Sequence, residues 1–64
     1  MELYEARNNV GARVSYHPAP GVVEHGTIKS VNNYFVYVLY DGDIHAKATS
    51  AGSLLLEGDI DGIL

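Results

Sequence analysis

The segment YFVYVLYDGD, residues 34 to 43, places seven apolar or aromatic side chains in an unbroken run that ends at an Asp-Gly pair. Asp-Gly favours a tight hairpin turn, so the run is predicted to be a β-strand that enters a hairpin. Successive side chains of a strand point to opposite faces of a sheet, and one face of a small sheet usually meets water. Here both faces would be apolar, so another part of the chain or another molecule must shield the second face from water.

The size and charge of the chain limit what it can be. At 64 residues it is long enough for one domain whose core is near the smallest that folds alone. It has no cysteine, so disulfides and cysteine-based zinc sites are excluded, and we expect a cytoplasmic location. The net charge is −4 and the four Lys and Arg residues are scattered, so we do not expect duplex nucleic acid as a partner. No apolar run is long enough to span a membrane, and the N-terminal segment is not expected to be a secretion signal, because it carries a negative charge where such a signal has a positive one.

Alternation and turn residues predict further short strands. Residues 10 to 17 alternate, with Val14 and Tyr16 among the apolar positions, and Pro18 is expected to end that strand. Residues 24 to 31 form the next strand, in which Gly26 indicates a bulge or a sharp bend. These strands, with the one already described, indicate a small antiparallel barrel or sandwich.

The remaining segments complete this arrangement. The Asn32-Asn33 pair is expected to supply the left-handed conformation of a tight hairpin. Residues 43 to 49 form a fourth strand, a short 3₁₀ turn near residues 50–54 follows, and Leu54 to Leu56 supply a last strand or a core plug. Residues 2 to 7 can form one helical turn, which must dock or fray because so short a helix is unstable alone.

The hairpin at Asp41-Gly42 allows two registers, which exchange the two faces of the strand before it. With a two-residue loop, Tyr40 pairs with Asp43, and the buried face consists of Phe35, Tyr37 and Leu39. With a three-residue loop, Tyr40 pairs with Ile44, Gly42 is left-handed, and the buried face consists of Val36, Val38 and Tyr40. The alternating pattern does not choose between them.

Residues 11 to 56, with their motifs EHGTI, YVLYDGD and AT followed by a leucine-rich turn, resemble the SH3-like and Tudor-like small barrels. More narrowly, they resemble a group of short phage and prophage proteins. The resemblance implies an all-β fold, a small five-stranded antiparallel SH3-like barrel over residues 10–57, between an N-terminal segment at 1–9 and an acidic tail at 58–64. In that group the position of Leu39 is usually charged, which implies the three-residue loop and an outward row formed by Phe35, Tyr37 and Leu39.

We expect this row to be a protein interface, covered by a second copy of the chain in a homo-oligomer, most simply a dimer, because soluble monomers usually avoid such a patch. The alternative is that another part of the same chain covers the row. Val14, Ile28, Val36 and Val38 are expected to be core.

Candidate sites for chemistry are few. The histidines His17, His25 and His45, with Glu24, Asp41 and Asp43, do not have the spacing of a metal site, so no metal or cofactor is expected. No catalytic motif is present, and we expect no enzyme. Tyr16, Tyr34 and His45 are candidates for a ligand-binding aromatic surface. A Tudor-type cage for a methylated cation would use Tyr16, Tyr34, Phe35 and Tyr37, although strand propensity and core filling explain three of these aromatics equally well.

These observations predict a non-catalytic binding module. The resemblance implies a phage or prophage protein that acts in the host cytoplasm by occupying a host protein or a small ligand. One alternative is an inhibitor of host defence or a nucleotide sponge. Another is a structural or interaction subunit of a phage assembly, which would bind a phage protein.

Overall fold

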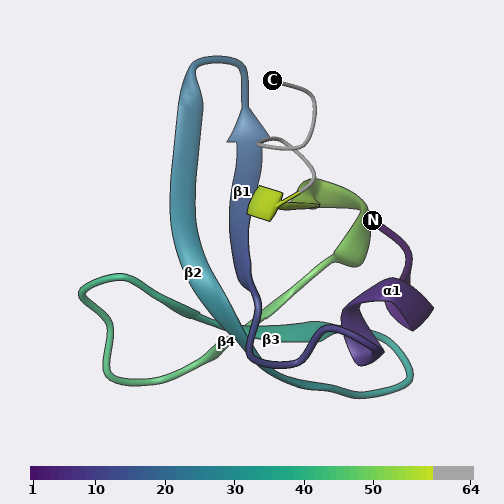
Figure 1. Cartoon of the computed structure of the whole chain (residues 1–64). Coiled ribbons are helices and arrows are strands. Elements are labelled where there is room, and N and C mark those ends of the chain that lie inside the picture. The colour runs from purple at the N-terminus through teal and green to yellow at the C-terminus, as the bar shows by residue number, and fades with distance from the viewer. Residues whose placement is uncertain (59–64) are drawn as a thin grey trace.

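Five strands, one of them long, and two short helices account for most of the described residues. The computed structural model describes residues 1 to 58; positions 59 to 64, most of the expected acidic tail, lie outside the described residues. In chain order the elements are α1 (Leu3–Arg7), β1 (Arg13–Ala19), β2 (Val22–Val31), β3 (Val36–Tyr40), β4 (Lys47–Thr49), the 3₁₀ helix η1 (Ala51–Ser53) and β5 (Leu54–Leu56) (Figure 1). The strands form one antiparallel sheet in the order β4-β3-β2-β1-β5. The predicted five-stranded antiparallel sheet and the short 3₁₀ turn before its last strand are confirmed. Within this part of the chain neither helix has the length and apolar character needed to cross a membrane.

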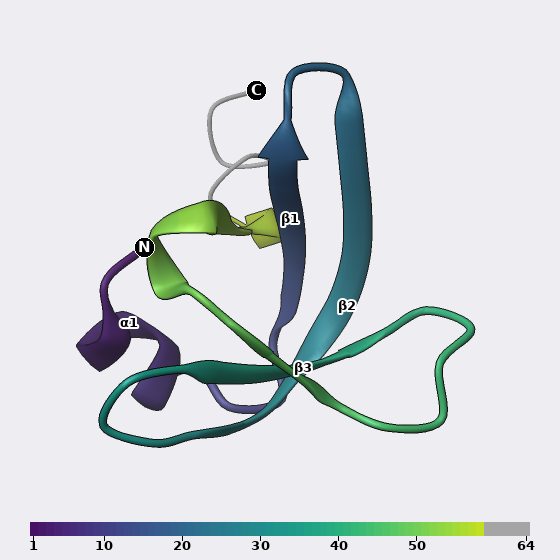
Figure 2. The same cartoon turned by 180° about the vertical axis from the view of Figure 1, so that it is seen from behind.

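The long strand β2 organises the sheet. Residues in its first half pair with β1, from Val22 opposite Ala19 to Thr27 opposite Arg13. Its second half pairs with β3, beginning at Gly26, which lies opposite Tyr40. β2 bends between these two halves, so β3 runs crosswise to β1 (Figures 1 and 2).

Gly26 lies where β2 changes partners. A Cβ atom there would lie 2.6 Å from the carbonyl oxygen of Leu39 and 2.7 Å from Cγ1 of Val38. Only glycine therefore allows β3 to approach so closely. The expected bend is present, but the expected bulge at Gly26 is not, since the register shift lies between Ile28 and Ser30.

The β1–β2 hairpin extends past its pairing with β5 and turns at Pro20-Gly21 (Figure 1). Pro18 does not end β1, which continues to Ala19. The register instead shifts between Tyr16 and Ala19, so the proline, which has no N–H group, lies in the irregular part of the strand. Beyond Tyr16 the end of β1 pairs only with the start of β2.

The core lies on the inner face of the bent sheet. Val14, Ile28, Val36 and Val38 are fully buried, as predicted. The rest of the core comes from α1, the end of β3, η1 and β5; its members are Ala6, Tyr40, Ala51 and Leu54. Each buried aliphatic side chain of this size contributes about 1.5 to 3 kcal/mol by the apolar area removed from water. Every helix and strand described except β4 thus contributes a side chain to the core.

The helix α1 docks rather than frays. It has only five residues, but Ala6 on its inner side is fully buried. The Met1 nitrogen before it donates hydrogen bonds to the carbonyl oxygens of Ala51 (3.1 Å) and Leu54 (2.8 Å). Arg7 at its end donates to the carbonyl oxygen of Asn32 (3.2 Å). Tertiary contacts therefore stabilise a helix that propensity alone could not.

The loop between β3 and β4 differs from both predicted registers. Val38 pairs with Lys47, so residues 39 to 46 separate the paired positions, and Tyr40 does not pair with Ile44. Ile44 is 86% exposed rather than on the buried face. A tight turn does form, since Asp43 N donates to Tyr40 O and Gly42 has the expected positive φ of +89°. The chain then runs outside the sheet as far as Lys47, which shortens the expected fourth strand from 43–49 to 47–49.

The loop between β2 and β3 closes in another way than predicted. No asparagine is left-handed, because no residue other than glycine has a positive φ in the described chain. Asn32 instead uses its side chain: its Oδ1 accepts hydrogen bonds from the backbone N–H groups of Tyr34 (2.8 Å) and Phe35 (2.7 Å). Side-chain acceptors of this kind stabilise turns without left-handed backbone.

Candidate functional site

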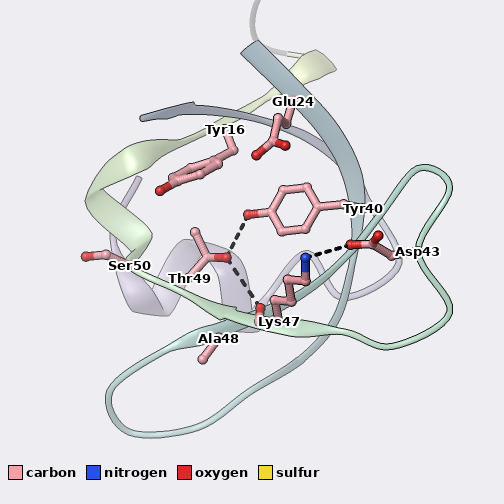
Figure 3. Close-up of a pocket in the computed structure, with 8 residues that line it drawn as sticks. All are labelled: Tyr16, Glu24, Tyr40, Asp43, Lys47, Ala48, Thr49 and Ser50. Atoms are coloured by element: carbon pink, nitrogen blue, oxygen red, sulfur yellow. Dashed lines mark hydrogen bonds and ion pairs between the residues drawn. The ribbon is translucent and has the colours of Figure 1, made fainter. Parts of the chain in front are cut away.

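A depression of about 240 Å³ lies at the base of the β1–β2 hairpin, between it and β4 (Figure 3). It is open to solvent on one side and draws on every part of the sheet except β5. Its lining consists of Tyr16, Glu24, Tyr40, Asp43, Lys47, Ala48, Thr49 and Ser50. Two aromatic rings, two carboxylates and one ammonium group thus meet on one concave surface.

The two rings come together because of the sheet register. Tyr40 lies opposite Gly26 on one side of β2, and Val14 lies opposite Gly26 on the other. Tyr16 is two residues beyond Val14 and therefore shares its face. Since Gly26 places no side chain between them, the Tyr16 and Tyr40 rings approach to 5.8 Å between centroids, at an interplanar angle of 53°. They are the only stacked or tilted aromatic pair among residues 1–58.

The phenol of Tyr40 is held in place by a hydrogen bond with Thr49. Its oxygen lies 2.7 Å from Oγ1 of Thr49, which is buried and in turn donates to the carbonyl oxygen of Lys47 at 3.3 Å. Either hydroxyl can be the donor in the Tyr40–Thr49 contact. Burial raises the pKa of Tyr40 above its ordinary value, and the hydrogen bond with Thr49 offsets only part of that rise. The ring is therefore a neutral and well-ordered wall of the depression.

The charges around the rings are unequal. Asp43 pairs with Lys47 at 3.2 Å, so this carboxylate and ammonium largely balance (Figure 3). Glu24 comes from β2, points toward the two tyrosines and forms no ion pair within residues 1–58 (Figure 3). The depression thus keeps one negative charge beside two aromatic faces.

This lining is suited to a cation. Aromatic faces carry negative electrostatic potential and attract ammonium or guanidinium groups, and a carboxylate at the rim adds to that attraction. An anion such as a phosphate would meet Glu24 and Asp43 instead. For a metal ion the donors are too few, since no three His, Asp or Glu side chains gather within the described chain.

The predicted site residues are brought together only in part. Tyr16 lines the depression, but its aromatic partner is Tyr40, which was expected to serve the core alone. Tyr34 is 76% exposed and lines a second, shallower hollow with Met1 and Leu3. His45 is exposed in the loop before β4. The structure therefore separates the predicted aromatic surface into distinct places.

The predicted interface row lies on the outer face of β3 as expected, since β3 alternates between buried and more exposed residues. Phe35, just before the strand, is 45% exposed. Tyr37 and Leu39 are half-buried, and the Tyr37 oxygen accepts a hydrogen bond from Nδ2 of Asn32 (3.0 Å). The row is less open to water than the sequence suggested, and its dimerisation stays a prediction.

Sequence reasoning missed Tyr40 and Glu24 as partners of Tyr16. Glu24 was considered only as a metal ligand, and Tyr40 only as a core residue. The available signal was Gly26, because a glycine inside a strand often marks a close approach of other groups. Its value depended on knowing that Val14 and Tyr40 flank it, which the sequence did not provide.

A separate network of charged side chains lies on the outer surface. Both terminal nitrogens of Arg13 donate to the Asp41 carboxylate at 2.7 Å. This bidentate contact raises the pKa of Arg13 and lowers that of Asp41. Glu57 extends the network, 3.9 Å from Arg13 Nε and 2.6 Å from His25 Nδ1. The network joins β1, β2 and the start of the β3–β4 loop.

Comparison with protein-family models, with curated proteins and with solved structures returned no match. The geometry of the depression is therefore the basis for assigning a function.

Proposed function

We propose that the protein is a non-catalytic binding module whose depression between Tyr16 and Tyr40 takes a cationic group of a partner. The observation that carries the proposal is the paired rings with the Glu24 carboxylate beside them. Such a site needs no covalent chemistry, only a pre-formed concave surface, and the buried Tyr40–Thr49 contact supplies its rigidity. The net charge of −4 favours the approach of a cationic partner.

The expected strength of one such contact is modest. A cation over exposed aromatic rings gains about 0.5 to 1 kcal/mol, and about 2 kcal/mol when it is desolvated. A solvent-exposed carboxylate adds about 1 kcal/mol or less. These contributions sum to about 3 kcal/mol or less, so a single ammonium group is expected to bind more weakly than about 1 mM, the affinity that corresponds to about 4 kcal/mol. A partner that binds more tightly than a single ammonium group must therefore make further contacts with the protein.

The finer identity of the fold belongs to the same proposal. We infer that the bent sheet is an SH3-like barrel, because the strand order β4-β3-β2-β1-β5, with η1 before β5, agrees with the resemblance. On that resemblance we also propose a phage or prophage origin, a cytoplasmic site of action, and a host protein as the partner. A nucleotide sponge is disfavoured at this depression, because its carboxylates would repel phosphate.

A direct test is an NMR titration of the ¹⁵N-labelled full chain with choline and with its neutral isostere 3,3-dimethyl-1-butanol. Choline is expected to shift the amide signals of residues lining the depression, whereas the isostere should shift them much less. Glu24→Gln should weaken choline binding severalfold. Glu2→Gln, which removes an exposed acid from another part of the surface, is the matched control. Equal shifts with choline and the isostere would refute recognition of a cation.

A further inference from the structure

The concave surface does not stop at Glu24. Side chains two residues apart on a strand share a face, so Val22 lies on the same side of β2 as Glu24. Val22 pairs with Ala19 of β1, and directly opposed residues also share a face. A strip of small apolar side chains therefore continues from the depression toward the tip of the hairpin.

This strip is open. Val22 is 46% exposed, and Ala19 is also exposed. The tip between them is Pro20-Gly21. Residues 18 to 23 contain no charged side chain. The hairpin stands clear of the rest of the described chain in both views (Figures 1 and 2). Exposed apolar side chains on a projecting hairpin are typical of a surface that docks a partner.

Charge selects the kind of partner. From residue 14 to residue 28 there is no Lys or Arg, and Glu24 is the one acidic residue. Anionic membranes and nucleic acids would therefore be repelled by the same surface that presents the apolar strip. A basic peptide segment fits both features, since its cation can enter the depression while a neighbouring apolar side chain covers Val22.

We infer that the hairpin binds an extended segment of a protein partner in which a basic residue and an apolar residue are two positions apart. This inference rests on the proposed function and adds the identity of the occupant. The spacing follows from the strand repeat: Glu24 and Val22 are separated by about 6.6 Å along β2, and side chains at positions i and i+2 of an extended peptide have the same separation. A helical ligand would not match, because its like-facing side chains recur every three or four residues.

The test uses capped peptides and the ¹⁵N-labelled full chain. Acetyl-Lys-Gly-Leu-amide or its reverse, acetyl-Leu-Gly-Lys-amide, is expected to bind at least about fivefold more tightly than acetyl-Lys-Gly-Gly-amide, because the leucine is partly buried on the strip. Acetyl-Lys-Leu-Gly-amide and acetyl-Gly-Leu-Lys-amide, with adjacent lysine and leucine, should lose most of that gain. The two orientations are both included because the strip fixes the spacing and not the direction.

Two variants of matched exposure separate the faces of the hairpin. Val22→Ser should abolish the advantage of leucine over glycine, whereas Val23→Ser should keep it, because Val23 is 47% exposed but points to the opposite face. If lysine peptides bind but leucine adds nothing, or if both variants lose the advantage equally, the strip is not a docking surface and the proposed cation site stands alone. If neither choline nor any lysine peptide binds, the proposed function itself fails and this inference fails with it.

Discussion

Replacing Gly26 by alanine tests the close approach on which both the fold and the candidate site depend. The added Cβ would lie 2.6 Å from Leu39 O, 2.7 Å from Val38 Cγ1 and 3.0 Å from Tyr40 Cα. The Leu39 oxygen would have to move by about 0.8 Å to reach an ordinary contact at 3.4 Å. Two of these three atoms belong to the backbone of β3, so no side-chain rotation can relieve the overlap.

The cost follows from what must move. Overpacking of a well-packed interior costs about 1 to 3 kcal/mol. Weakening one or two hydrogen bonds between β2 and β3 adds about 1 kcal/mol for each. We therefore expect Gly26→Ala to lower the free energy of unfolding by about 2 to 5 kcal/mol. A domain of 64 residues has about 3 to 10 kcal/mol in all, so this is a large fraction.

Urea denaturation followed by circular dichroism measures this change, and thermal unfolding should show a melting temperature lower by about 8 °C or more. Gly52→Ala is the control, because a Cβ there meets nothing within 4 Å and its φ is not positive. Alanine at such a position stabilises by about 0.4 to 1 kcal/mol through the unfolded state. If Gly26→Ala and Gly52→Ala unfold at the same urea concentration, β3 does not approach β2 as described. A folded Gly26→Ala protein that keeps its stability but loses choline binding would show that only the ring pair depends on this glycine.

Four further predictions concern other parts of the molecule. Val38→Asp should unfold the domain, since it buries a carboxylate without a partner at a cost of several kcal/mol; a cooperative unfolding transition for this variant would contradict the assignment of Val38 to the core. Gly42→Val should destabilise by about 1 to 2 kcal/mol or more because φ is +89° there, and chemical denaturation measures the difference. Arg13 lowers the pKa of Asp41 in the folded protein, so the ion pair stabilises above the ordinary carboxyl pKa of 3.8 and this contribution is lost as the pH falls through the lowered value. Asp41→Asn should therefore be slightly less stable than the parent at pH 7 and equally stable in strong acid, and an unchanged difference across that range would argue against the pair. If the outer face of β3 forms a dimer, Tyr37→Glu should remain folded and sediment as a monomer while the parent sediments as a dimer; a parent that is already monomeric at micromolar concentration would end that proposal.

The strand residues 36 to 40 illustrate how a local pattern can be read correctly while its pairing is read wrongly. The resemblance selected the face formed by Val36, Val38 and Tyr40, and that face is buried. The predicted pairing of Tyr40 with Ile44 is wrong, because the chain leaves the sheet after the Gly42 turn. The face of β3 is set by its pairing with β2, so the length of the loop that follows does not change it. The buried face of β3 and the length of the loop after it are therefore independent of each other, although the prediction had linked them.

The candidate site shows the opposite balance. Nothing in the residues around Tyr16 indicated that Tyr40 and Glu24 would stand beside it. Their positions depend on β2 pairing with β1 over one half and with β3 over the other. Such pairings join residues far apart in the chain, and their energies depend on the whole core rather than on local propensity.

The sequence by itself indicated the positions of the strands, though not the length of the fourth, and the turn at Gly42, because alternation and turn chemistry act over a few residues. The buried face of β3 was chosen by the resemblance and not by the alternating pattern. Only the tertiary structure decided how far the β3–β4 loop extends, how the short helix is stabilised, and which rings form the depression. Those outcomes follow from long-range pairing and from the space that Gly26 leaves open, where a single missing side chain lets β3 lie against β2 and brings Tyr16 to Tyr40.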